Sequence, residues 1–124
     1  MLTTMETRLQ KIEKWRIEEL SLVLKKIDEL LRKGNNSEWA NVFHHYYEES
    51  RFIIASEEFS LAQVLKLVKN IRNCFSGVSS LRNIVLWHEN NEEKMWINEE
   101  FPQLRTRLLK IIGDIEERSV EYVS

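Results

Sequence analysis

A long apolar stripe dominates the first third of this chain. Between Leu9 and Leu31, apolar side chains recur every three or four residues, and charged side chains fill the positions between them. This spacing marks one face of an α-helix, and a basic last turn followed by Gly34 is typical of a helix end. We therefore predict a helix over residues 4–33. A helix of this length would be unusual, so a kink or break is expected near Ser21. The stripe is predicted to pack on its own domain, although it is long enough to pair with a second copy.

The same helical spacing recurs three more times, in residues 38–54, 59–75 and 98–120. Ser37 stands before the first of these segments and Asn98 opens the last, and both residue types are good helix N-caps. The whole chain has only three glycines and one proline, far fewer than a β-sandwich would carry.

These features predict a mainly α protein: a single helical domain over residues 1–124, built as a four to five helix bundle. The residues expected to hold its core include Trp39, Leu65, Leu81 and Trp96. The single cysteine, Cys74, lies at an apolar helix end and is expected to be a buried, unreactive thiol.

One stretch interrupts the helical pattern. Gly77 breaks the third helix, and two short runs rich in aliphatic and aromatic residues follow, Ile84–Trp87 and Met95–Ile97. Two asparagines between them suit a turn. We predict a possible short β-hairpin near 83–97, while a helical reading of 81–88 remains open.

Charge is unevenly distributed along the chain, although the net charge is only −2. Residues 37–60 hold five acidic residues and one basic residue, and residues 89–100 repeat that imbalance. If the two segments converge, they form a negative patch beside aromatic side chains, which suits a basic protein partner. The alternative is that these acids are solvated helix starts and turns, where acidic residues are common.

Several functional classes receive no support from the sequence. His44/Glu48 and His45/Glu49 are two i,i+4 pairs that point about 100° apart on a helix, so they are not expected to ligate one metal ion. No catalytic motif of high specificity occurs, and we predict neither an enzyme nor a cofactor. A net charge of −2 does not favour binding to nucleic acid, which calls for a strongly basic surface. The sequence shows neither a signal-peptide-like start nor an apolar run of membrane-spanning length. The expected location is the cytoplasm.

One motif resembles that of the HEPN ribonucleases, which are small helical dimers. Arg82 and His88 have the Arg-x(4–6)-His spacing, and Asn83 supplies the polar residue after the arginine. The resemblance implies that Arg82 and His88 act on an RNA phosphate, with His88 moving a proton and Arg82 stabilising charge. The acidic residues after His88, and Asn90 where the family has tyrosine, depart from the pattern.

A second resemblance covers more of the chain, from about Leu20 to Ile112. The chain resembles small bacterial proteins found among toxin-immunity genes, of the contact-dependent growth inhibition type. The matching features are the polar turn leading to Trp39-Ala40, the loop with aliphatic run over Ser76–Leu86, and the Asn98-Glu99-Glu100 helix start. Ser76 stands where that family has the first loop glycine.

This resemblance implies a cytoplasmic, all-α immunity protein that binds a cognate toxin domain and neutralises it by covering its active site. The toxin domain is expected to be a basic nuclease. The protein would be a monomer or weak dimer. The residues expected to bind the toxin are Tyr46, Tyr47, Glu48, Glu49, Glu57, Glu58, Glu89, Glu92 and Glu93. The ribonuclease that uses Arg82 and His88 is the alternative.

Overall fold

The computed structural model describes residues 12–57, 60–77 and 80–121, apart from the side chains of the last two. Four α-helices make up most of this part of the chain: α2 (Lys14–Lys33), α3 (Ser37–Ala55), α4 (Leu61–Asn73) and α5 (Asn91–Glu121). A short 3₁₀ helix, η1 (Leu81–Asn83), lies between α4 and α5. The prediction of a mainly α bundle is therefore confirmed.

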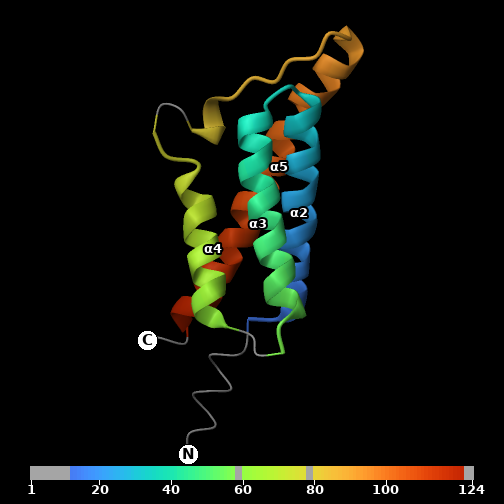
Figure 1. The fold of residues 1–124 in the computed structure, drawn as a ribbon. Coiled ribbons are helices and arrows are strands. Elements are labelled where there is room, and N and C mark those ends of the chain that lie inside the picture. Colours follow the sequence, from blue (N-terminus) through green and yellow to red (C-terminus); the bar gives the residue numbers. More distant parts are fainter. Residues whose placement is uncertain (1–11, 58–59, 78–79, 122–124) are drawn as a thin grey trace, which may run out of the picture.

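The helices are arranged as a bundle (Figure 1), and their buried apolar side chains form one core. α2 packs against α3 and α5, and α4 packs against α3 and α5 on the other side. The predicted stripe on α2 lies in the core, where Leu20, Leu24 and Ile27 are inaccessible to solvent. None of the described helices combines the length and apolarity needed to cross a membrane.

Two predictions about the first helix need correction. α2 begins at Lys14, residues 12 and 13 are not helical, and the predicted stretch before residue 12 lies outside the described residues. The helix does not break at Ser21: α2 is continuous over Lys14–Lys33, and Ser21 is buried within it.

The helix starts also differ from the prediction. Asn36, not Ser37, caps α3, since its Oδ1 accepts the backbone N–H of Trp39 at 3.2 Å. The last helix starts seven residues before Asn98: Asn90 Oδ1 accepts the N–H of Glu93 at 3.0 Å and so caps α5 there. Proline 102 consequently lies inside α5 rather than in a first turn.

The predicted hairpin near 83–97 is wrong. Among the described residues there is no strand: residues 84–88 are extended without a partner strand, and Met95–Ile97 belong to α5. We call residues 84–88 the strap. It crosses the end of the bundle at which α2 ends and α3 begins (Figure 1). Gly77, with φ +85°, does break the chain after α4, as expected.

The predicted core residues divide into three groups. Leu81 is fully buried, Trp39 and Leu65 are half-buried, and Trp96 is exposed. Cys74 is a buried free thiol, as predicted, and burial raises its pKa.

Ion pairs fix the antiparallel pairing of α2 and α5 at both ends. At one end, Arg118 Nη2 and Arg16 Nε both donate to the Glu13 carboxylate, just before α2. At the other end, Lys33 Nζ lies 2.8 Å from Glu93 Oε2. Arg118, followed by Arg16, lowers the pKa of Glu13 to about 2.

The Glu13 contact predicts an acid-dependent contribution to stability. Because the folded-state pKa lies below the ordinary value of 4.5, the contribution is present above the unfolded-state pKa and is lost as the pH falls towards 2. Glu13→Gln is expected to lower the free energy of unfolding at pH 6 by up to about 1 kcal/mol, since the pair is partly exposed. That difference should shrink towards zero near pH 2 in urea titrations, whereas exposed Glu18→Gln should have little effect at either pH. An equal Glu13→Gln effect at both pH values would contradict the assignment.

Gly34 predicts a second test, because the strap lies directly against it. A Cβ atom at Gly34 would lie 2.7 Å from Leu86 Cβ, whereas a Cβ at Gly113, within α5, would meet nothing within 4 Å. Gly34→Ala should therefore lower the free energy of unfolding by about 1–3 kcal/mol through overpacking. The matched control Gly113→Ala should raise it by about 0.5–1 kcal/mol, the usual gain for alanine in a helix. Equal urea midpoints for the two variants would contradict the close contact between the strap and Gly34.

Candidate protein-binding site

One side chain of α5 forms the hydrogen bonds with the strap that a neighbouring strand would form in a sheet. Asn98 Oδ1 accepts the backbone N–H of Leu86 at 3.0 Å, and Asn98 Nδ2 donates to the Leu86 carbonyl at 2.8 Å. The same Nδ2 also donates to the Lys94 carbonyl at 2.8 Å, which fixes the side chain on its own helix. One asparagine thus satisfies both backbone groups of the buried Leu86.

The turn between α2 and α3 holds the other edge of the strap. The Trp87 backbone N–H donates to the Gly34 carbonyl at 3.1 Å, and Asn35 Nδ2 donates to the Trp87 carbonyl at 3.0 Å. Asn35 takes the left-handed conformation, with φ +61°, which asparagine tolerates better than most residues. The strap is therefore hydrogen-bonded along both edges.

The strap turns alternate side chains into the core and into solvent. Leu86 is buried and Ile84 is half-buried, while Val85 is 80% exposed and Trp87 is 55% exposed. Met95, in the first turns of α5, is exposed as well. Large apolar side chains held outward on an ordered backbone are typical of protein-binding surfaces.

Acidic residues follow the strap directly. Glu89 and Glu92 are exposed, and neither forms an ion pair with another described residue. Glu93 differs, because its contact with Lys33 neutralises it and lowers its pKa. We call the exposed Val85, Trp87, Met95, Glu89 and Glu92 the strap surface.

The predicted site residues on α3 have other contacts. Tyr46 and Tyr47 are half-buried and pack against the core, and the Tyr46 hydroxyl lies 3.7 Å from Cys74 Sγ. Burial, together with this contact, raises the pKa of Tyr46. Glu48 and Glu49 pair at 2.7 Å with His44 and His45 of their own helix.

The two predicted acidic segments lie apart. Glu57 follows the end of α3, at the opposite end of the bundle from the turn that precedes α5 (Figure 1). Glu58 lies outside the described residues. The nine predicted residues therefore do not form one face: Glu89, Glu92 and Glu93 lie by the strap, and the others that are described lie along α3 or just beyond it.

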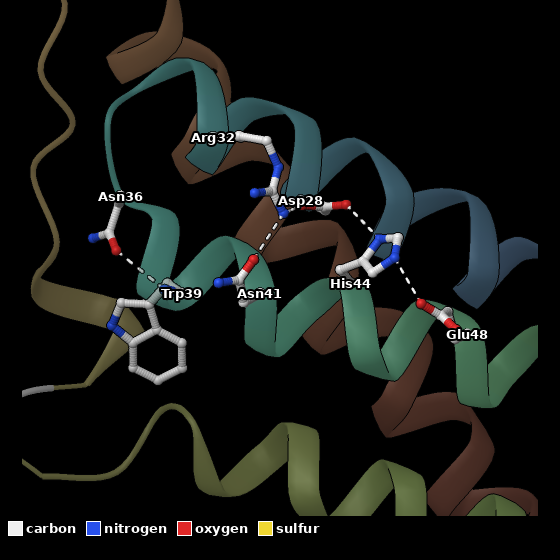
Figure 2. A network of polar contacts seen from close by, with 7 residues as sticks. All are labelled: Asp28, Arg32, Asn36, Trp39, Asn41, His44 and Glu48. Carbon is white, nitrogen blue, oxygen red and sulfur yellow. Dashed lines mark hydrogen bonds and ion pairs between the residues drawn. The ribbon is translucent and has the colours of Figure 1, made fainter.

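A polar network links α2 to α3 (Figure 2). The Asp28 carboxylate, with only 11% of its side chain exposed, accepts from Arg32 at 2.8 Å and lies 3.0 Å from His44 Nδ1. Arg32 also donates to Asn41 Oδ1 at 3.2 Å, and His44 Nε2 contacts Glu48. Because both ring nitrogens of His44 face carboxylates, neither is free to ligate a metal or to act as a base on a substrate. The network joins the two helices.

The alternative catalytic residues lie at opposite ends of the strap. Arg82 is exposed in η1, and the extended residues from Ile84 to His88 alone span about 13 Å. The half-buried His88 accepts the N–H of Asn90 on Nδ1 at 3.0 Å. Within one chain, this extended segment therefore separates the backbone positions of Arg82 and His88.

A second arginine lies beside Arg82. Arg105 Nη1 donates to the carbonyls of Leu81 and Arg82, and burial together with the Arg82 charge lowers the pKa of Arg105. This contact attaches η1, and thus the start of the strap, to α5. Across the described ranges, no three His, Cys, Asp or Glu side chains gather as a metal site would need.

The sequence analysis predicted the acidic residues of the strap surface, Glu89 and Glu92, but missed its apolar residues and the side chain that holds the strap. Val85 and Trp87 were assigned to a hairpin, and the role of Asn98 was read as a helix cap. The alternation of side chains in Ile84–Trp87 was the available signal, because it predicts an extended segment with one buried side. Nothing local to Asn98 marks it as a partner for a segment twelve residues earlier.

Comparison with protein-family models, with curated proteins and with solved structures gave no match to this chain.

The network in Figure 2 predicts a contrast between two adjacent histidines. His44→Ala removes one partner of the buried Asp28 carboxylate and should lower the free energy of unfolding by about 1–2 kcal/mol. His45→Ala removes the exposed pair with Glu49 and a loose ring contact with Tyr46, but no partner of a buried charge, and should change the free energy of unfolding by less than about 0.5 kcal/mol. Urea unfolding of the two variants at neutral pH measures the difference. Equal losses would show that Asp28 gains nothing from His44.

Proposed function

We propose that this chain is an immunity-type protein, which acts by binding a toxin domain produced with it and covering that domain's active site. The observation that carries the proposal is the strap surface. Val85 and Trp87 point outward from a segment that is hydrogen-bonded along both edges, so little conformational freedom would be lost when a partner orders them. Binding, rather than catalysis, is what such a surface suits.

The charge next to these anchors supports a basic partner. Glu89 and Glu92 have no ion pair among the described residues, so their potential is available to a cationic surface. Two copies of the strap surface would place these carboxylates against one another, which disfavours self-pairing at this surface. A basic nuclease domain has the required charge, and covering its cleft would block it without any chemistry.

The α3 residues contribute less to this proposal. Tyr46 and Tyr47 are partly buried, and Glu48 and Glu49 already face histidines. We therefore place toxin binding on the strap surface, with Glu93 held beside it by Lys33. The stretch Ser76–Leu86, which resembles the loop and aliphatic run of the immunity-type family, includes the first three residues of the strap.

The test uses the protein encoded next to this chain as the toxin candidate. Co-expression should rescue growth, and the purified pair should form a stoichiometric complex. Replacing Val85 and Trp87 by serine should weaken binding at least 100-fold, as loss of a central aromatic anchor does. Glu89→Lys with Glu92→Lys should slow association more than it speeds dissociation.

Glu48→Lys with Glu49→Lys is the matched control, because it makes the same change in net charge on α3. It should leave the affinity within about threefold. If the α3 reversal abolishes binding and the strap variants bind normally, the proposed surface is wrong. Growth arrest by this chain alone, relieved by His88→Ala, would instead favour the ribonuclease.

A further inference from the structure

A second exposed surface lies on the far side of α5 from the strap contacts. α2 and α5 run antiparallel, and a groove of about 560 Å³ lies between them. The buried side chains of Leu30 and Leu104 form part of its floor. Its lining residues are Lys26, Glu29, Leu30, Lys33, Trp96, Glu100, Gln103, Leu104 and Arg107.

Apolar side chains remain exposed along this groove. Trp96, in its lining, is 48% exposed, with Lys33 Nζ 5.1 Å from the ring centre. Leu22 is 60% exposed and lies one turn before Lys26 on the same side of α2. Trp15, two turns earlier on that side, is also exposed. Trp15 and Leu22 thus lie on the side of α2 that faces the groove, and exposed apolar side chains gathered along one line are a feature of protein-binding surfaces.

The charges of the groove are arranged by sign. On α5, Glu100 precedes Arg107 by about two turns, and on the antiparallel α2, Glu29 follows Lys26. Both carboxylates therefore lie towards the Trp96 end, and both unpaired cations lie towards the Leu22 end. None of these four side chains forms an ion pair with another described residue. Lys33, the remaining cation, is neutralised by Glu93.

We propose that the α2/α5 groove is the interface of a homodimer, in which it pairs with the same groove of a second copy of this chain. A two-fold axis across the middle of the groove turns the second copy end for end. Its Lys26 and Arg107 then face Glu29 and Glu100 of the first copy, and the reverse holds at the other end. Trp96 of each copy meets the Leu22 end of the other. The groove is thus complementary to itself in charge, which the strap surface is not.

The test is sedimentation equilibrium of the purified chain with two complementary charge-reversal variants. Lys26→Glu with Arg107→Glu makes all four charges acidic, and Glu29→Lys with Glu100→Lys makes all four basic. The wild type should be dimeric at about 100 µM, because an interface of standard size is expected to have a dissociation constant below this concentration. Each variant alone should be monomeric, with dimerisation weakened at least tenfold, because like charges then face one another.

An equimolar mixture of the two variants decides the matter, since it should form a heterodimer and thereby prove that both variants are folded. Lys25→Glu with Lys69→Glu, two exposed lysines outside the groove, is the matched control and should dimerise like the wild type. A monomeric wild type, variants that dimerise as well as the wild type, or a mixture that stays monomeric would each overturn the proposal. Glu89→Lys with Glu92→Lys should leave dimerisation unchanged, so this test is independent of toxin binding.

Discussion

The hydrogen bonds between Asn98 and Leu86 are the contact on which the position of the strap depends. A segment that crosses the end of a helical bundle has no sheet to satisfy its backbone groups, and burying Leu86 without partners would cost several kcal/mol. The Asn98 amide supplies one donor and one acceptor at the required spacing. The α2–α3 turn does the same for Trp87 on the opposite edge. With both edges held, the backbone that carries the two outward side chains is fixed in place.

This arrangement also explains why the bundle has two exposed surfaces of different kinds. The strap covers one end of the core and carries Val85 and Trp87 outward beside the exposed Glu89 and Glu92. The long contact of α2 with α5 leaves a groove in which acids and bases are separated by position instead. A surface of one sign suits a partner of the other sign, whereas a surface divided into two signs suits a copy of itself. We therefore assign the two surfaces to different partners.

The sequence predicted the helices well because their cause is local and repetitive. The apolar spacing on α2 and the break at Gly77 each identify an element without knowledge of its neighbours. The failure came where a distant group decides the conformation. Residues 84–88 do have the extended character expected of a strand, but their hydrogen-bonding partner is a side chain of α5. Asn90 then starts α5 early enough to include Met95–Ile97, which a hairpin would have needed.

The candidate site was predicted in part for the same reason. The acidic turn before α5 was recognised from composition, and it does adjoin exposed aromatic and aliphatic side chains. The α3 residues were added on the assumption that two acidic segments converge, which depends on the order in which helices pack. Composition carries no information on that order. The pairing of Glu48 and Glu49 with histidines was readable from the i,i+4 spacing, and the structure contains both pairs.

Amide hydrogen exchange along the strap, followed residue by residue by NMR, tests the central claim most directly. The Leu86 and Trp87 amides should exchange much more slowly than the amide of the neighbouring, exposed Val85. The Leu86 and Trp87 N–H groups are both hydrogen-bonded, which protects them from exchange. In Asn98→Ala, protection should fall most at Leu86, whose N–H loses its acceptor. Fast exchange at all three positions in the wild type would mean that the strap is not held by Asn98 and the α2–α3 turn, and would contradict the account.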